Sequence, residues 1–413
     1  MSGLAPLDDV RAEILGAVGA LEPVEVALVD AHGLVLAVAV TTSEDVPPFA
    51  NTAMDGYAVR AADTAGAGPD TPVRLRVVGD LPAGHAPDRA VGEGEAIRIM
   101  TGAPMPEGAD AIVMVERTRA EGVEVWIEAE VDAGTHVRAA GGDLTRGQEV
   151  FPAGTLLGGA HLGVLASVGA GTVRVFPRPR VGVLSTGDEL VESGSGRVEP
   201  LAPGKIRDSN RPMLLALVAE AGFEPVNLGV VRDDEDRITA LLEEALAQCD
   251  AILTSGGVSV GDYDYVKAAL DRLGHLEWRQ VAIKPAKPLA FGVVRGTPVF
   301  GLPGNPVSSL VSFELFARPA ILQRAGHPFR FRPEVMARAE HAFTRKPDGK
   351  LHLDRVRVEW SEGGYVARST GNQASNALAA TAAANGLALI GDGDGVQKGE
   401  AIRVMLLNAA PDH

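Results

Sequence analysis

Residues 180–190 read RVGVLSTGDEL, an apolar run that ends in a glycine turn and two acidic residues. Further apolar runs at 226–231 and 251–254 are separated by stretches with helical spacing at 211–221, 235–247 and 265–273. Such alternation predicts a parallel sheet covered by helices. More strands are expected near 281, at 289–294 and at 299–302, followed by a helix over 306–324. Because Gly326-His327-Pro328 ends this pattern, we expect an α/β domain over residues 179–326.

Three further domains are expected around the α/β domain. Residues 46–140 are rich in glycine, proline and valine and contain short strand-like runs, which predicts an inserted β domain. A helix over 7–21, a hairpin within 24–40 and a second helix over 159–168 that packs on the first predict a mixed N-terminal domain, made of residues 1–45 and 141–178. Alternating runs in residues 327–413 predict a C-terminal β barrel.

Composition excludes several classes of protein. The 413 residues are 46% apolar, which suits two to four globular domains. Thirty-eight basic against fifty-four acidic residues give a net charge of −16, which argues against binding to nucleic acid or to an anionic membrane. One cysteine, Cys249, excludes an intrachain disulfide framework and a thiolate-rich metal cluster. With no secretory signal pattern and no long apolar run, we expect a cytoplasmic protein.

The predicted sheet carries polar turns at the ends of its strands, where ligands of open parallel sheets collect. The glycine-rich stretch 254–265, TSGGVSVGDYDY, leaves backbone N–H groups free to approach phosphate. Lys284 and Lys287 in IKPAKP supply positive charge, and GLPGNP at 301–306 frames a helix N-terminus. We therefore expect an anion pocket at this edge, which the overall acidic charge makes necessary for any anionic substrate.

Carboxylates at the same edge offer a metal site. Glu189, Asp208 and Asp264 would supply hard oxygen ligands, which suit Mg²⁺ beside phosphates. The alternative for Asp208 is that it and Ser209 only cap the following helix.

A hydrolase is another alternative, because Gly257-x-Ser259-x-Gly261 matches a nucleophile elbow. Histidines at positions 275 and 327 could serve as bases. Asp262 and Asp264 argue against it, since negative charge beside a developing oxyanion raises the barrier.

Long motifs resemble one known family. Residues 47–60 read PPFANTAMDGYAVR, which is similar to the PxFxxSxMDGYAV signature of the MoeA and gephyrin E-domain family, with Thr52 in place of the usual serine. Other motifs that resemble the family follow in its order: RIMTGAPMP (98–106), DAIV (110–113), STGDEL (185–190), RDSNR (207–211), TSGGVSVGDYDYVK (254–267), IKPAKP (283–288) and GLPGNP (301–306). Ala374 stands where glycine is usual in GNQASN at 371–376.

The resemblance implies a molybdopterin molybdenumtransferase with an elongated N-terminal domain and a molybdopterin-binding α/β domain. Its substrates would be adenylylated molybdopterin and molybdate, and it would cleave the adenylate with Mg²⁺ and release AMP. The implied catalytic residues are Asp55, Thr101, Asp143, Glu189, Asp208 and Asp264. The implied substrate-binding residues are Gly256, Gly257, Ser259, Gly261, Lys284, Lys287, Pro303, Asn305, Pro306, Arg355 and Ser375.

The same resemblance implies a homodimer in which Asp55 and Thr101 act on the partner's α/β domain. The expected partners are a molybdopterin adenylyltransferase and proteins that mature molybdoenzymes. Because the pterin's dithiolene holds the molybdenum, no cysteine ligand is needed. Two alternatives stay open: a molybdopterin adenylyltransferase, which resembles the α/β domain but normally lacks the flanking domains, and a non-catalytic scaffold like gephyrin.

Overall fold

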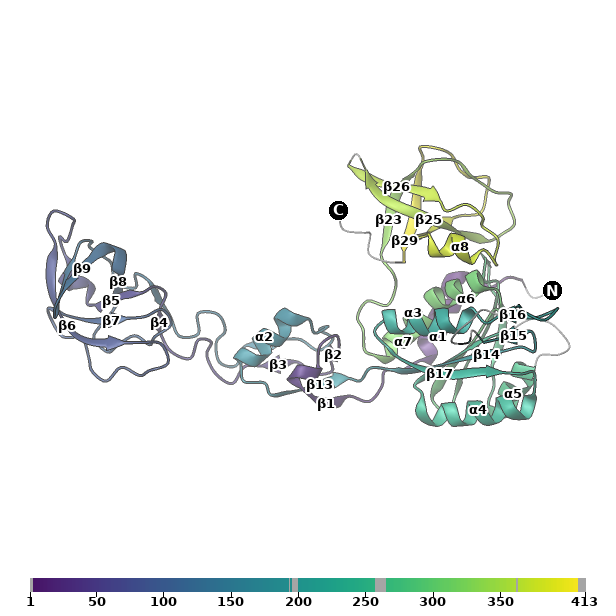
Figure 1. The fold of residues 1–413 in the computed structure, drawn as a ribbon, viewed down its shortest axis with the longest axis horizontal. Helices are drawn as coiled ribbons and strands as arrows, with labels where there is room; N and C mark the ends of the chain where they lie inside the picture. The colour runs from purple at the N-terminus through teal and green to yellow at the C-terminus, as the bar shows by residue number, and fades with distance from the viewer. Residues whose placement is uncertain (1–2, 193, 195–199, 257–264, 362, 408–413) are drawn as a thin grey trace. The chain divides into compact units, whose positions relative to one another are not determined.

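The computed structural model describes residues 3–192, 194, 200–256, 265–361 and 363–407. The chain divides into two compact units, drawn as a ribbon in Figure 1. The larger unit comprises Met1–Glu25, Gly33–Ala37 and Arg174–His413, and the smaller comprises Val26–His32 and Val38–Val173. Across the described ranges, no helix is both long and apolar enough to cross a membrane.

A six-stranded sheet forms the centre of the larger unit. Its order is β17 (Glu224–Val231), β14 (Arg180–Thr186), β18 (Ala251–Ser255), β22 (Thr297–Leu302), β21 (Pro288–Val294) and β19 (Glu277–Gln280). The first four strands are parallel, as predicted. Every residue of β18 and β22 is buried, as expected for strands covered on both faces.

The prediction of a parallel sheet is wrong for β21, which runs antiparallel to both of its neighbours. Val294 pairs with Thr297, so only Arg295 and Gly296 connect β21 to β22. Both residues have positive φ, 51° and 84°. Such a two-residue turn forms a hairpin, whereas a parallel connection needs a crossover of a dozen or more residues.

Helices cover the two faces of this sheet. The helices α4 (Glu235–Gln248) and α5 (Tyr265–Leu273) pack on one face through one apolar core. A second core joins the sheet to the other helices: α1 (Leu7–Ala17), α3 (Asn210–Glu220), α6 (Pro306–Ser312) and α7 (Arg318–Arg324).

The first helix does not lie where the sequence suggested. We expected it to pack on the helix over 159–168, but α1 contacts α7 and the π-helical turn Phe313–Ala317 that precedes α7. Pro319 has no N–H to donate to the carbonyl of Leu315, and the Arg11 Nε donates to that carbonyl instead, at 3.3 Å. The predicted helix over 306–324 is confirmed in its limits, with this π turn inside it.

The C-terminal region is the predicted barrel. Its closed ring runs through β25 (Leu351–Ser361), β26 (Gly364–Ser369), β23 (Glu334–Ala339), β29 (Ala401–Leu406) and β27 (Gly386–Ile390), and β27 pairs with β25 to close it. The short strand β20 (Ile283–Lys284) of the α/β domain adds to β25 in parallel, so Lys284 lies opposite His352.

The smaller unit contains the predicted β domain and the helix α2 (Gly159–Ser167). Its sheet has the order β8 (Ala111–Met114), β5 (Gly56–Val59), β7 (Glu95–Ile99), β6 (Val73–Leu81), β10 (Glu124–Ile127) and β9 (Thr118–Glu121). The hairpin predicted within 24–40 is wrong: β13 (Thr172–Phe176) lies between β1 (Val24–Ala27) and β2 (Val35–Leu36).

The core around β22 yields a stability prediction. Phe300 is fully buried, whereas Phe329 in the linker to the barrel is 85% exposed. Phe300→Ala should lower the free energy of unfolding by about 3–5 kcal/mol, because it removes a buried ring and leaves a cavity. Phe329→Ala, the matched control, should change it by less than about 0.5 kcal/mol. Urea denaturation followed by tryptophan fluorescence measures both, and equal effects would contradict the core assignment.

Candidate functional site: a basic pocket beside the sheet edge

A pocket of about 910 Å³ lies in the larger unit, with walls from the α/β domain and the barrel. Six of the predicted substrate-binding residues line it: Lys284, Lys287, Pro303, Asn305, Arg355 and Ser375. In total six lysine and arginine side chains and two aspartates line the pocket. In a chain whose net charge is −16, this makes the pocket locally basic.

A tight turn at residues 284–287 places two lysines on the α/β wall of the pocket. Ala286 adopts a positive φ of 72°, and the N–H of Val281 donates to the carbonyl of Lys287 at 2.7 Å, which closes the turn. Both lysines are exposed at the pocket wall. Within the described part of the chain, neither ammonium group has a hydrogen bond or an ion pair. Lys284 acts electrostatically on Asp354 of the same pocket, where its positive charge counters the rise in the Asp354 pKa that burial causes.

The barrel wall is organised by Arg355, whose side chain is fully buried. Its guanidinium donates to the carbonyls of Asn372 and Ala374 at 3.0 and 3.1 Å. The Gln373 amide accepts from the N–H of Arg355 at 2.8 Å and donates to its carbonyl at 3.0 Å. Burial lowers the pKa of Arg355, and the adjacent Asp354 opposes that shift. Arg355 therefore holds the loop that carries Ser375.

That loop also docks on the α/β domain. The N–H of Val307, in the first turn of α6, donates to the carbonyl of Ser375 at 3.1 Å. Pro306 is the first residue of this helix and is absent from the pocket lining. The helix N-terminus that we expected to face an anion thus has one of its donors engaged by the protein.

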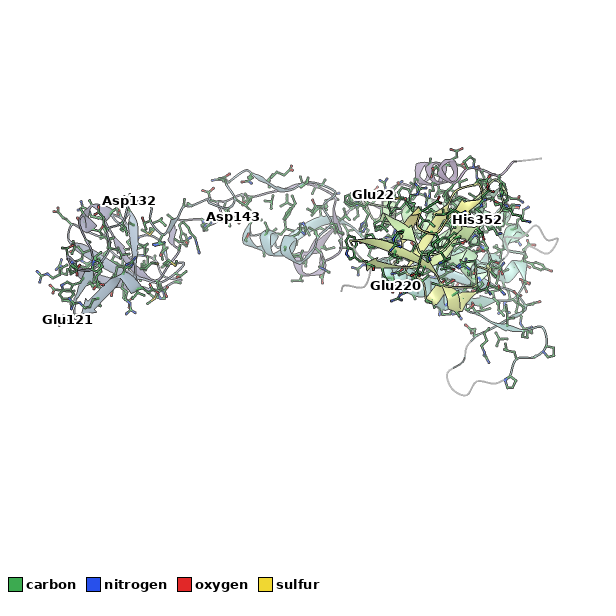
Figure 2. The ribbon with its side chains drawn as sticks, turned by 90° about the horizontal axis from the view of Figure 1, so that it is seen from above. Glu22, Glu121, Asp132, Asp143, Glu220 and His352 are labelled. Carbon is green, nitrogen blue, oxygen red and sulfur yellow. The ribbon has the colours of Figure 1, made fainter. Side chains whose placement is uncertain are left out.

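Sequence reasoning missed the other residues of the barrel wall: Thr344, Arg345, Lys346, Asp348, Lys350, His352 and Asp354. Asp348 accepts from Lys350 at 2.9 Å and lies 3.2 Å from the His352 Nε2, and these contacts lower its pKa. Burial raises the pKa of Asp354. The signal that could have found this wall is the density of basic residues over 345–355 in an otherwise acidic chain. Figure 2 labels His352 on the barrel.

One of the three predicted magnesium ligands, Asp264, lies outside the described residues, and the other two, Glu189 and Asp208, have different surroundings. Glu189 is exposed on the turn after β14. The buried Asp208 carboxylate is engaged: it accepts from the Arg211 Nε at 2.9 Å, from the Arg211 N–H at 3.2 Å and from the Ser185 hydroxyl at 3.1 Å. Asp208 thus caps α3 and pairs with Arg211, in line with the alternative considered for it. The described residues contain no cluster of three His, Cys, Asp or Glu side chains that could hold a metal.

Four predicted residues, Gly257, Ser259, Gly261 and Asp264, lie outside the described residues. Gly256, which precedes them, has a φ of 99°, and a Cβ there would approach the Thr186 carbonyl to 2.8 Å. Glycine is therefore required where β18 passes the end of β14.

Three predicted residues lie in the smaller unit. The N–H and the hydroxyl of Thr101 both donate to the Asp55 carboxylate at 2.7 Å, and these two bonds lower the pKa of Asp55. Asp143, labelled in Figure 2, lies on the connection between β11 (Val137–Arg138) and β12 (Glu149–Phe151). The structure therefore brings Asp55 and Thr101 together as a hydrogen-bonded pair.

The fold and the pocket define a multidomain α/β protein with a C-terminal barrel and a pocket lined by basic side chains. Three family models match it in sequence: the MoeA N-terminal region (domain I and II) at 5–169, a probable molybdopterin binding domain at 182–323, and the MoeA C-terminal region (domain IV) at 337–407. The chain belongs to the MoeA family.

Individual proteins agree with the family models. Molybdopterin molybdenumtransferase 2 of Mycobacterium tuberculosis is 42% identical over 89% of this chain and 91% of its own length. A molybdopterin molybdenumtransferase of Bacillus subtilis is 35% identical over 92% of this chain and 89% of its own. A crystal structure of a molybdopterin biosynthesis MoeA protein from a Pyrococcus species has a TM-score of 0.82 at 33% identity, and covers 98% of this chain and all of its own.

The Asp208 contacts predict a structural role that stability measurements can test. Asp208 forms an ion pair with Arg211, and its side chain is only 1% exposed. Asp208→Asn keeps the shape of this side chain and removes its negative charge. It should lower the free energy of unfolding by about 2–4 kcal/mol. Glu192, the other partner of Arg211, is 59% exposed, so Glu192→Gln should cost less than about 1 kcal/mol. A loss for Glu192→Gln that equals the loss for Asp208→Asn would contradict this role.

The Thr101 contacts predict a shift in the titration of Asp55. Thr101→Val removes the hydroxyl donor, so the pKa of Asp55 should rise towards its ordinary value, whereas Thr101→Ser should leave it low. Carboxyl ¹³C NMR titration, with the Asp55 signal assigned by its loss in Asp55→Asn, measures both variants. An unchanged pKa in Thr101→Val would show that the hydroxyl bond is not formed in solution.

Proposed function

We propose that this chain transfers molybdenum from molybdate to adenylylated molybdopterin and releases AMP. Its family makes it an enzyme of molybdenum cofactor biosynthesis. The observation that carries the specific reaction is the basic pocket, where Lys284 and Lys287 are exposed without hydrogen bonds or ion pairs within the described residues. Molybdate is a tetrahedral dianion, and two ammonium groups match its charge.

The pocket suits a transfer reaction in which the protein supplies position and charge. Molybdate alone is much smaller than the cavity of about 910 Å³, which leaves room for part of the pterin substrate. The dithiolene sulfurs of the pterin hold the metal, so the protein needs only to orient the oxyanion beside them. Lys284 and Lys287 would neutralise the oxyanion from the α/β wall, and Ser375 would offer polar contacts from the barrel wall.

Magnesium is retained in the proposal only as a requirement for cleaving the adenylate. The Asp208 carboxylate already accepts hydrogen bonds from Arg211 and Ser185, so no role as a metal ligand is assigned to it. Glu189 remains exposed and Asp264 lies outside the described residues. No step is therefore assigned to the cation, which when bound would offset negative charge on the phosphates.

The proposal includes a homodimer in which the Asp55–Thr101 pair of one chain completes the site of its partner. A cytoplasmic location, handover of substrate from a molybdopterin adenylyltransferase and delivery to molybdoenzyme-maturation proteins are also part of it. The adenylyltransferase alternative is disfavoured because family models match the flanking domains as well as the α/β domain. The scaffold alternative predicts binding of a protein without turnover.

The deciding experiment supplies purified protein with adenylylated molybdopterin and magnesium, with and without molybdate, and follows AMP release and metallated pterin. Molybdate-dependent release of AMP with metallated product would support the transferase, and the same assay with EDTA tests the magnesium requirement. Adenylylation of free molybdopterin by ATP would indicate the adenylyltransferase instead. No turnover of either kind would favour the scaffold.

The lysines of the pocket predict a change in oxyanion affinity. Lys287→Ala should weaken molybdate binding by about tenfold, because a charge-assisted contact contributes on the order of 1.5 kcal/mol. Lys398→Ala, which removes the same charge from an exposed site of the barrel away from the pocket lining, should have little effect. Isothermal titration calorimetry with molybdate measures both variants. Equal affinities for Lys287→Ala and wild type would remove Lys287 from the oxyanion site.

The dimer predicts complementation between inactive variants. At molybdate concentrations well below the dissociation constant, Asp55→Asn and Lys287→Ala chains should each be strongly impaired alone. They should regain about one quarter of wild-type activity when mixed dimers form, since half the dimers are then mixed and each has one intact site. The AMP-release assay after co-expression with two different tags measures this. Activity that stays at the level of the single variants would mean that both residues act within one chain.

A further inference from the structure

A row of buried polar groups lies at the sheet edge where the substrate-binding turns begin. We call it the polar seam and define it as the side chains of Ser185, Asp208, Asn210 and Ser255 with the backbone carbonyl of Gly304. Each of these four side chains belongs to a residue that is at most 8% exposed. Burial of so many polar groups is costly unless they are bonded to one another.

Asn210 is the centre of the polar seam. Its Nδ2 donates to the Ser255 Oγ and to the Gly304 carbonyl, both at 2.7 Å. Because a carbonyl only accepts, the Gly304 contact fixes which end of the amide carries the nitrogen. The Asn210 Oδ1 is buried and has no partner among the described residues. Asn210 therefore holds its neighbours only through the two hydrogen bonds that its Nδ2 donates.

The polar seam connects separate turns of the sheet. The Ser185 hydroxyl, at the end of β14, donates to Asp208, which stands two residues before Asn210 at the start of α3. Ser255 is the last residue of β18, and Gly304 lies between β22 and α6. One asparagine therefore links the start of α3 to the ends of two strands.

Two predicted substrate-binding residues directly follow the groups that Asn210 holds. Gly256 follows Ser255, and its N–H donates to the Leu302 carbonyl at 3.1 Å. Asn305 follows Gly304 and lines the pocket. Because both amide protons of Asn210 are committed, a change in this side chain would alter the spacing between Gly256 and Asn305.

We infer that Asn210 is a positioning residue that sets the spacing between Gly256 and Asn305, on which binding of the adenylylated substrate depends. This inference rests on the proposed function. A leucine of similar size would bury more apolar surface at this place, so stability alone does not account for an asparagine with an unbonded oxygen. Asn210 acts through Ser255 and Gly304 and does not touch the reacting atoms.

The test compares Asn210 with a matched buried asparagine. Asn385, in the barrel, is also 8% exposed, and its side chain bonds both the N–H and the carbonyl of Val358, at 2.7 and 2.8 Å. Both Asn210→Ala and Asn385→Ala should lower the free energy of unfolding. Only Asn210→Ala should also weaken AMP binding, by about tenfold in calorimetry, and speed amide hydrogen exchange in peptides covering 251–256 and 302–305. Asn210→Asp, which keeps the size but loses the donors, should behave like Asn210→Ala.

Each outcome decides between a positioning and a purely structural role. If Asn210→Ala and Asn385→Ala lose stability equally and both bind AMP like the wild type, the inference is wrong. If Asn210→Ala does not fold, Asn210→Ser keeps one donor and should show an intermediate loss of AMP affinity; wild-type affinity in that variant would overturn the inference. Absence of AMP binding by the wild type would contradict the proposed function instead, and the exchange rates would then still decide the role of Asn210.

Discussion

The pairing of β20 with β25 is the contact on which the pocket depends. It extends the barrel sheet by a strand of the α/β domain, so the two walls of the pocket share backbone hydrogen bonds. Lys284 lies on one side of this pairing and His352 on the other. The loop held by Arg355 adds a second connection through Ser375 and Val307. The positions of the basic groups on the two walls are therefore set by main-chain geometry as well as by side-chain packing.

Electrostatics explain why this geometry matters in this chain. Most of the surface of a protein with a net charge of −16 repels oxyanions, so a site for one must be built from local charge. On the barrel wall, the negative charge of Asp348 is offset by Lys350, which donates a hydrogen bond to it, and His352 lies beside it. The α/β wall leaves Lys284 and Lys287 without ion pairs within the described part of the chain. Both walls therefore carry excess positive charge: four basic and two acidic side chains line the barrel wall, and two lysines line the α/β wall.

Much of the fold followed from local patterns, and the exceptions have a common cause. The strands and helices of residues 180–324 could be predicted because each carries its own periodicity, and the pocket lysines because they follow strands. The antiparallel direction of β21 could have been predicted from the two-residue connection to β22, which is too short for a parallel crossover. The alternation of strands and helices elsewhere in the domain favoured a parallel sheet instead. The partners of β2 and of α1 could not be predicted, since β13 and α7 lie far along the chain and nothing local selects them. Asp208 was assigned to metal binding because its bond with Arg211 depends on how α3 begins, which composition does not reveal.

The contact between Arg11 and the Leu315 carbonyl has a consequence for how the chain is made. The two residues are 304 positions apart, and the buried face of α1, with Val10 and Ile14, packs on the same C-terminal helices. At synthesis rates of about 5–20 residues per second, α1 leaves the ribosome roughly 15–60 s before its binding surface exists. During that interval its apolar face has no native partner. This helix therefore docks well after it is made, because its partners at 313–324 follow about 300 residues later.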